Sequence, residues 1–237
     1  MFNPGNIPGQ ILLSRVAGST AYNLNVGESD LDYQLVYLEK TPRLLGLNRP
    51  DESVVGASPN DFTAHEVGKF LRLALKGNPT ITENLISDIG PQDYCNELFQ
   101  SLRNGVDRII SANTIRSYLG YAYGQMHKMQ IKDNGLHSKG GKYNEKYGMH
   151  LIRLLHNAVQ LATLGTATVR WPIGSEIHKE LMAIRNGLST KQDVEDRAEQ
   201  LTQLIDSSKP WKLREEPDYE WVNEWLVKQR LGLGMFI

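Results

Sequence analysis

The sequence lacks both disulfide-forming cysteines and long hydrophobic runs. Cys95 is the single cysteine in 237 residues, so no disulfide framework can form within the chain, and a reducing compartment is favoured. No stretch reaches the length of about eighteen apolar residues that indicates a membrane-spanning helix. Residues 1–5 also lack the basic and apolar regions of a signal peptide. We therefore expect a cytoplasmic protein with no membrane partner.

Several common catalytic motifs and any excess of charge are missing as well. The sequence contains no C-x-x-C pair, no H-E-x-x-H, no G-x-S-x-G and no Walker loop, so zinc, serine-hydrolase and P-loop chemistry have no support. The 26 basic residues are balanced by 27 acidic ones, which gives a formal net charge of −1. Attraction to nucleic acid must therefore come from a local segment. The length of 237 residues is enough to bury a real core.

The most informative stretch begins with a strand-like apolar run at residues 11–17, Ile-Leu-Leu-Ser-Arg-Val-Ala. Gly18 and Ser19 follow it, and small residues of this kind open a turn. A short helix is expected from Thr20 to Leu24, so that backbone N–H groups at its start face whatever lies there. Such a turn suits the phosphate oxygens of a ligand.

A second strand is predicted over residues 29–38, Ser-Asp-Leu-Asp-Tyr-Gln-Leu-Val-Tyr-Leu. Because side chains alternate along a strand, Asp30 and Asp32 would point the same way. Two adjacent carboxylates repel each other unless a positive group lies between them, and oxygen ligands suit Mg²⁺ bound together with substrate phosphates. The alternative is a pair of aspartates on a solvated strand edge. The Gly-Ser that precedes them favours the metal site.

A strand that ends in Gly-Ser, followed by a short helix and then by Asp-x-Asp on the next strand, resembles the signature of the DNA polymerase β-like nucleotidyltransferase superfamily. In this chain the motif is Ala-Gly-Ser-Thr-Ala-Tyr at residues 17–22 and Ser-Asp-Leu-Asp at residues 29–32. The Ala-Tyr and the Ser before the first Asp are similar to one branch, predicted nucleotidyltransferases of bacterial and phage type. Further stretches with the same likeness are Lys69–Leu71, Gly77–Pro79, His150–Leu155 and Ala183–Gly187.

The resemblance implies roles for individual residues. Gly18 would let the chain come close to a nucleotide, and Ser19 would donate a hydrogen bond to a phosphate. Asp30 and Asp32 would hold two Mg²⁺ ions. The superfamily places a third carboxylate on a strand beside the Asp-x-Asp strand, where it binds metal or acts as a general base, and we assign this role to Asp61.

The assignment of Asp61 has an alternative. A helix is predicted to begin near Thr63, and Asp is a favoured N-cap residue, so Asp61 would also suit the cap of that helix. Glu66 and Glu83 are the reserve candidates for the third carboxylate. His65 is a further candidate for the site, although a lone His is more often a surface residue or a satisfied core residue.

Residues 111–160 form a basic segment that is interleaved with aromatic residues. It contains seven Lys and Arg residues but only two acidic residues, and it also contains five Tyr. The positions of one possible helix face, i, i+4 and i+7, are occupied by Lys146, His150 and Arg153. That face could hold a triphosphate or an RNA end, and we assign the three residues to nucleotide binding. The alternative is an ordinary helical domain with a solvated Lys face.

The same segment indicates an RNA acceptor, because Lys side chains can follow a phosphate backbone while aromatic rings stack on bases. Possible acceptor contacts are Lys128, Lys139 and Lys142. Protein adenylylation, transfer to a small molecule and a non-catalytic nucleic-acid-binding module stay open as alternatives.

We therefore predict an α/β fold in which a small mixed-sheet catalytic domain at residues 1–90 is followed by a helical substrate-binding domain at residues 91–237. The expected activity is Mg²⁺-dependent transfer of a nucleoside monophosphate from ATP or another NTP to an acceptor hydroxyl, with release of pyrophosphate. The apolar segment at residues 231–237 is expected to dock on this chain or on a second subunit of a homo-oligomer.

Overall fold

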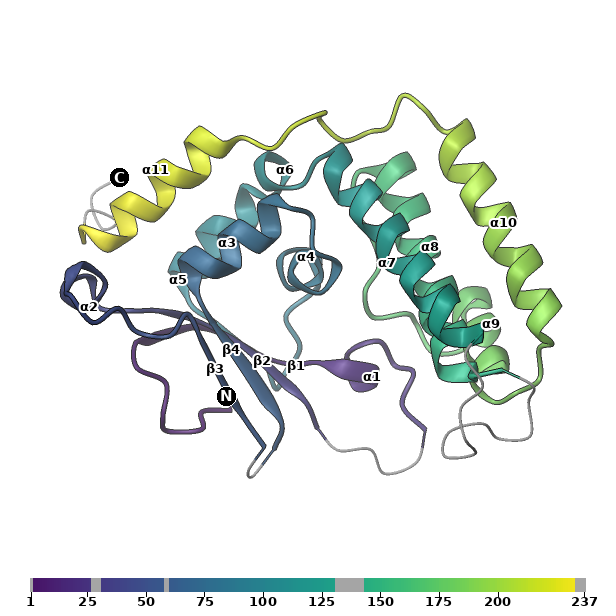
Figure 1. Ribbon diagram of the computed structural model, residues 1–237, viewed down its shortest axis with the longest axis horizontal. Helices are drawn as coiled ribbons and strands as arrows, with labels where there is room; N and C mark the ends of the chain where they lie inside the picture. The colour runs from purple at the N-terminus through teal and green to yellow at the C-terminus, as the bar shows by residue number, and fades with distance from the viewer. Residues whose placement is uncertain (1, 27–30, 58–59, 131–142, 233–237) are drawn as a thin grey trace.

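A computed structural model describes residues 2–26, 31–57, 60–130 and 143–232 (Figure 1). Its five-stranded sheet has the order β3-β4-β2-β1-β5. β1 is antiparallel to both of its neighbours, β2 and β4 are parallel, and β3 is antiparallel to β4. The strands are β1 Gln10–Val16, β2 Tyr33–Leu38, β3 Ser53–Gly56, β4 Phe62–Glu66 and β5 Tyr94–Cys95. The predicted α/β class with a mixed sheet is confirmed.

Helices supply the rest of the described architecture. In chain order they are α1 Gly18–Ala21, α2 Thr41–Leu45, α3 Val67–Leu75, α4 Pro79–Ile86, α5 Glu97–Asn104, α6 Val106–Ile109, α7 Ala112–Gln130, α8 Glu145–Leu164, α9 Glu176–Arg185, α10 Lys191–Ser207 and α11 Tyr219–Arg230. No helix in the described ranges is long and apolar enough to cross a membrane.

Helix starts follow from local sequence signals. α4 begins with Pro79, whose fixed φ suits the first turn of a helix, and the side chain of Asn78 accepts a hydrogen bond from the N–H of Ile81 at 3.2 Å. α8 begins after Asn144, whose side chain accepts from the N–H of Tyr147. These two helices form two walls of the site described below, so their caps fix where those walls begin.

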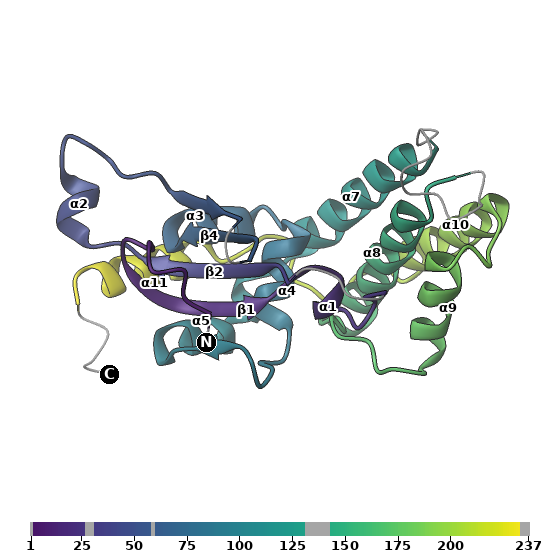
Figure 2. The ribbon, with the colours of Figure 1, turned by 90° about the horizontal axis from the view of Figure 1, so that it is seen from below.

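The molecule has two main hydrophobic cores, one at each end. Figures 1 and 2 both show the sheet with α3, α5 and α11 at one end of an elongated molecule and α7 to α10 at the other. In the first core, Val222 and Trp225 of α11 pack with Phe70 of α3 and Phe99 of α5. The second core is built mainly from α7 to α10, and the segment that follows β1 also reaches it.

These cores do not follow a division at residue 90. β5 pairs with β1, α5 packs on the sheet, and α11 returns from the far end of the chain to the same core. The Oγ1 of Thr41 donates to the carbonyl of Arg230 at 2.6 Å and ties the end of α11 to α2. The domain bounds of 1–90 and 91–237 stay a prediction, whereas the sheet core takes residues from both sides of that bound.

Two predicted elements need correction. The helix expected near Thr63 is instead strand β4, and α3 begins only at Val67. The side chain of Glu66 caps α3 by accepting from the N–H of Gly68 at 2.7 Å, so one residue both ends the strand and starts the helix. The second strand begins at Tyr33 and not at residue 29. Asp30 lies outside the described residues, and so do residues 233–237 of the apolar terminal segment.

Candidate active site

The turn after β1 holds Gly18 directly against Asp32. The N–H of Ala17 donates to the carbonyl of Asp32 at 2.8 Å, which extends the pairing of β1 and β2 beyond the strands. Gly18 has φ +64, in the left-handed region that favours glycine. A Cβ on Gly18 would lie 2.4 Å from Oδ2 of Asp32. Glycine is therefore required both by the backbone conformation and by the carboxylate beside it.

Asp61 lies next to Asp32 in the sheet. β2 and β4 are parallel with Tyr33 opposite Phe62, and the N–H of Tyr33 donates to the carbonyl of Asp61 at 2.8 Å. Each aspartate thus immediately precedes its strand at the same edge of the sheet, and both are exposed. Because a strand follows Asp61, the alternative that it caps a helix is wrong. Its position beside the second motif strand is the one that the resemblance implies for a third carboxylate.

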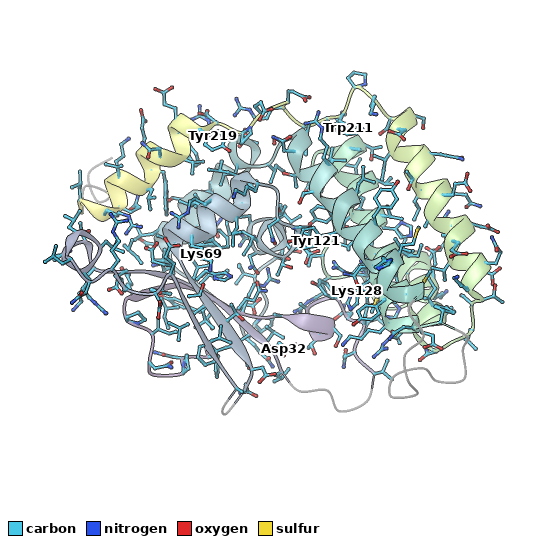
Figure 3. All side chains as sticks on the ribbon, viewed as in Figure 1. Asp32, Lys69, Tyr121, Lys128, Trp211 and Tyr219 are labelled. Atoms are coloured by element: carbon cyan, nitrogen blue, oxygen red, sulfur yellow. The ribbon has the colours of Figure 1, made fainter. Side chains whose placement is uncertain are left out.

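A cavity of about 640 Å³ opens at this edge of the sheet. Its sheet side contains the Gly18 turn, Asp32 and Asp61, and its opposite side comes from α4, α8 and the segment after α8. The residues on the opposite side are Thr80, Glu83, Asn84, His150 and Val169. Figure 3 shows Asp32 at the end of the sheet that faces the helical half of the molecule. The volume is within the range of small-molecule sites, roughly 300–1,000 Å³.

The donor set at this edge fits a hard divalent cation. Asp32 and Asp61 offer carboxylate oxygens to one cavity, and Mg²⁺ prefers one or two carboxylates together with substrate phosphates. Within the described ranges, no group of three or more His, Cys, Asp or Glu residues is arranged to hold a metal ion. Asp30, the other predicted ligand, lies outside those ranges.

Glu83 is held by three side chains and anchors the helical side of the cavity. Its Oε2 accepts from the hydroxyl of Tyr22 at 2.8 Å, and its Oε1 accepts from Arg153 Nη1 at 2.5 Å and from Asn157 Nδ2 at 3.4 Å. Burial alone would lower the pKa of Arg153, but the adjacent Glu83 outweighs it and the pKa is raised. The guanidinium also lies 3.9 Å from the centroid of the Tyr22 ring.

Arg153 is engaged in this network and does not line the cavity. Both Arg153 and Glu83 are buried, and Arg153 is not among the residues that line the site. Its charge is already neutralised by Glu83, so the structure does not bring it to a triphosphate. Glu83 does line the cavity, but its carboxylate is engaged by three donors, which suits an anchor better than a third metal ligand. Tyr22 directly follows α1, so the network fastens the Gly18 turn to α4 and α8.

His150 lines the cavity as a neutral group. Burial, together with the positive charges of Arg153, Lys146 and Arg185, lowers the pKa of His150 to about 3. The imidazole therefore offers a neutral hydrogen-bond donor and acceptor, not a positive charge for phosphates. Lys146, one turn earlier on α8, is exposed and does not line the cavity. The three residues predicted to share one helix face thus lie in three different environments.

Comparison with known proteins identifies the family. Residues 6–229 match the model of the RNA repair pathway DNA polymerase beta family (RlaP). The chain belongs to this family. The protein is thus a DNA polymerase β-like nucleotidyltransferase, and the predicted superfamily is confirmed.

No curated protein matches the nucleotidyltransferase. A crystal structure of a nucleotidyltransferase-like protein from Exiguobacterium sibiricum 255-15 is 10% identical, with 95% of this chain and 83% of that chain covered. The TM-score between the two structures is 0.31.

Two reserve candidates of the nucleotidyltransferase lie away from the cavity. Glu66, at the far end of β4 from Asp61, caps α3 and pairs with Arg230 at 3.0 Å. His65 lies 2.8 Å from the hydroxyl of Ser53 through Nδ1, and burial together with Lys69 lowers its pKa. Neither residue lines the cavity.

The predicted acceptor contacts are only partly described. Lys128 is exposed on α7, with Nζ 5.7 Å from the centroid of the Tyr147 ring, and Figure 3 shows Lys128 on the same helix as Tyr121. Lys139 and Lys142 lie outside the described residues. Ser19 follows Gly18 within α1 and is half-buried.

Three further residues that line the cavity of the nucleotidyltransferase were not predicted from the sequence. Arg15 on β1 and Gln34 on β2 are opposite each other in the sheet, and the side chain of Asn84 on α4 donates to that of Gln34. All three line the cavity. A signal for Arg15 was present, since it is a charged residue inside an otherwise apolar strand.

Proposed function

We propose that this enzyme transfers a nucleoside monophosphate from an NTP to a hydroxyl group of an RNA and releases pyrophosphate. The observation that carries the proposal is the meeting of the Gly18 turn, Asp32 and Asp61 in one cavity. A turn that brings backbone close to a ligand, with carboxylates at the adjacent strand ends, is suited to a nucleotide with its metal.

Each residue has a role that follows from its place. Asp32 and Asp61, together with Asp30, would hold Mg²⁺, which when bound stabilises charge on the attacking and leaving oxygens. Asp61 would also accept the proton of the acceptor hydroxyl, since its carboxylate is exposed to the cavity. Gly18 leaves room for the phosphates, and Ser19 donates a hydrogen bond to one of them.

Two observations favour RNA as the acceptor. The family description refers to an RNA repair pathway. In addition, the 19 residues of α7 include no Asp or Glu, and this helix exposes Tyr121, Tyr123 and Lys128. Exposed aromatic rings beside Lys can stack on bases and follow a phosphate backbone. A protein or small-molecule acceptor would need neither feature.

The test is incubation of the enzyme with each labelled NTP, Mg²⁺ and either total RNA or total protein. We expect label in RNA, and we expect the D32N/D61N double variant to transfer none. Label in protein instead of RNA would show that the acceptor is a protein, and the proposed nucleotidyl transfer would still stand. Absence of label from every pool, with a wild-type enzyme that binds NTP, would contradict nucleotidyl transfer.

A further inference from the structure

The cavity contains a buried cation that none of the roles above uses. Arg15 on β1 is only 4% exposed and lines the cavity. It lies opposite Gln34 in the sheet, two residues before Ala17, whose N–H pairs with Asp32. Since alternate residues of a strand share a face, Arg15 lies on the face of the sheet that leads to Asp32.

Arg15 has more donors than partners. Its Nη1 donates to the main-chain carbonyl of Glu83 at 3.2 Å, and in the part of the chain that the structure describes it forms no ion pair. The acids that act on it most are Asp93 and Glu83. Asp93 accepts instead from the N–H of Val16 at 3.0 Å and of Gly90 at 2.8 Å, and Glu83 is held by Arg153 and Tyr22.

A purely structural role explains this arrangement poorly. The carbonyl of Glu83 already accepts from the N–H of Ser87, the C-cap residue of α4, at 3.0 Å, so it does not need Arg15. Burial lowers the pKa of Arg15, while Asp93 and Glu83 oppose that effect. A buried guanidinium without an ion pair is costly unless an anion completes its surroundings.

The other cations considered for the phosphates are not available. Arg153 is neutralised by Glu83, Lys146 does not line the cavity, and His150 is neutral at physiological pH. Of the described residues that line the cavity, Arg15 alone is a Lys or Arg. A nucleoside triphosphate adds negative charge to a site that already has two carboxylates, and a guanidinium in the same cavity would offset part of that charge alongside Mg²⁺.

We propose that Arg15 is a substrate-binding residue that donates to a phosphate oxygen of the nucleoside triphosphate and of the pyrophosphate that leaves. This inference rests on the proposed function and names the residue that receives the phosphate charge. The planar guanidinium presents several N–H donors in a fixed fork that matches phosphate oxygens. One donor stays on the Glu83 carbonyl and holds the fork in place.

The test compares R15M and R15K with a matched control, R103M. Arg103 is half-buried, donates from Nε to the carbonyl of Leu85 at 3.1 Å and does not line the cavity. The probes are inorganic pyrophosphate and ATP, each with Mg²⁺, and adenosine, with dissociation constants measured by calorimetry.

We expect R15M to weaken pyrophosphate and ATP binding about 10- to 100-fold, as for loss of one charge-assisted contact. R15K should be intermediate, R103M close to wild type, and adenosine binding equal in all variants. The melting temperature of ligand-free R15M should equal or exceed that of wild type, because an unpaired buried charge is removed. A structural arginine would give the reverse: a lower melting temperature with unchanged pyrophosphate binding.

Unchanged pyrophosphate binding by R15M would overturn the inference, while transfer by the wild type would leave the proposed function standing. A wild-type enzyme that binds neither ATP nor pyrophosphate would contradict both. If R15M does not fold, the inference is tested on the wild type by NMR. The Arg15 Nε–H signal is assigned by its absence from the spectrum of R15K. Pyrophosphate should shift that signal and not the signal of Arg103; an unshifted Arg15 signal would overturn the inference.

Discussion

The two sides of the cavity treat their charges differently. On the sheet side, Asp32 and Asp61 are exposed at adjacent strand ends, and Arg15 faces the same space without an ion pair in the described chain. On the helical side, Glu83 and Arg153 neutralise each other in the protein interior. Glu83 lines the cavity too, but its carboxylate is already paired with Arg153. We therefore propose that the sheet side carries the chemistry and that the helical side supports it.

The largest effect is expected on the sheet side. Asp32→Asn should lower transfer by about 10³-fold or more, since the loss of one positioned charged group already costs roughly 10²- to 10⁴-fold. The fold should remain, because Asp32 is exposed. Steady-state transfer of label and a melting curve measure the two quantities. Full transfer by D32N would show that the sheet side does not carry the catalytic residues.

On the helical side the expected effect is on stability. Arg153→Met leaves the buried Glu83 without its cation, and such a loss costs about 3–5 kcal/mol. Denaturant unfolding of the variant and of the wild type measures the difference. The double variant E83Q/R153M should lose less than the sum of the single variants, because it leaves no unpaired charge. If R153M loses less than about 1 kcal/mol of unfolding free energy, the pair contributes no more to stability than a surface ion pair does.

An effect that is small near neutral pH and grows in acid is expected from His150, and its sign follows from the lowered pKa. With a folded pKa of about 3 and a usual value of 6.5, His150 binds a proton in the unfolded state but not in the folded state between these pH values. The free energy of unfolding should therefore fall as the pH drops from 6.5 toward 3. His150→Gln should flatten this part of the stability profile. An identical profile in H150Q would show that the imidazole is not held neutral.

The smallest effect concerns the acceptor. If RNA is bound along α7, Lys128→Ala should reduce the slope of log affinity against log salt by about 0.7, the value for one phosphate contact of a single strand. The matched control is K191A, since Lys191 pairs with Glu195 on α10 at 3.5 Å. Equal slopes for both variants and the wild type would place the RNA elsewhere.

The sequence was sufficient where the signal is local. The Gly18 turn could be predicted because Gly-Ser after an apolar, strand-like run opens a turn, and β2 lies within the strand predicted over residues 29–38. β4 was missed because the strand continues into α3 without a break, and Glu66 belongs to both. The pairing of Glu83 with Arg153 joins residues 70 positions apart, so spacing along α8 could not reveal that Arg153 is already neutralised.

The most direct test of the central claim is Asp61→Asn in a single-turnover transfer assay with saturating NTP. Asn keeps the size of the side chain, and Asp61 caps no helix, so no change in fold is expected. If the carboxylate at the start of β4 completes the site, the transfer rate should fall by at least about 10²-fold, while the dissociation constant of the NTP changes far less. A D61N enzyme with a near-normal rate would contradict the account, because the sheet side would then have no third carboxylate.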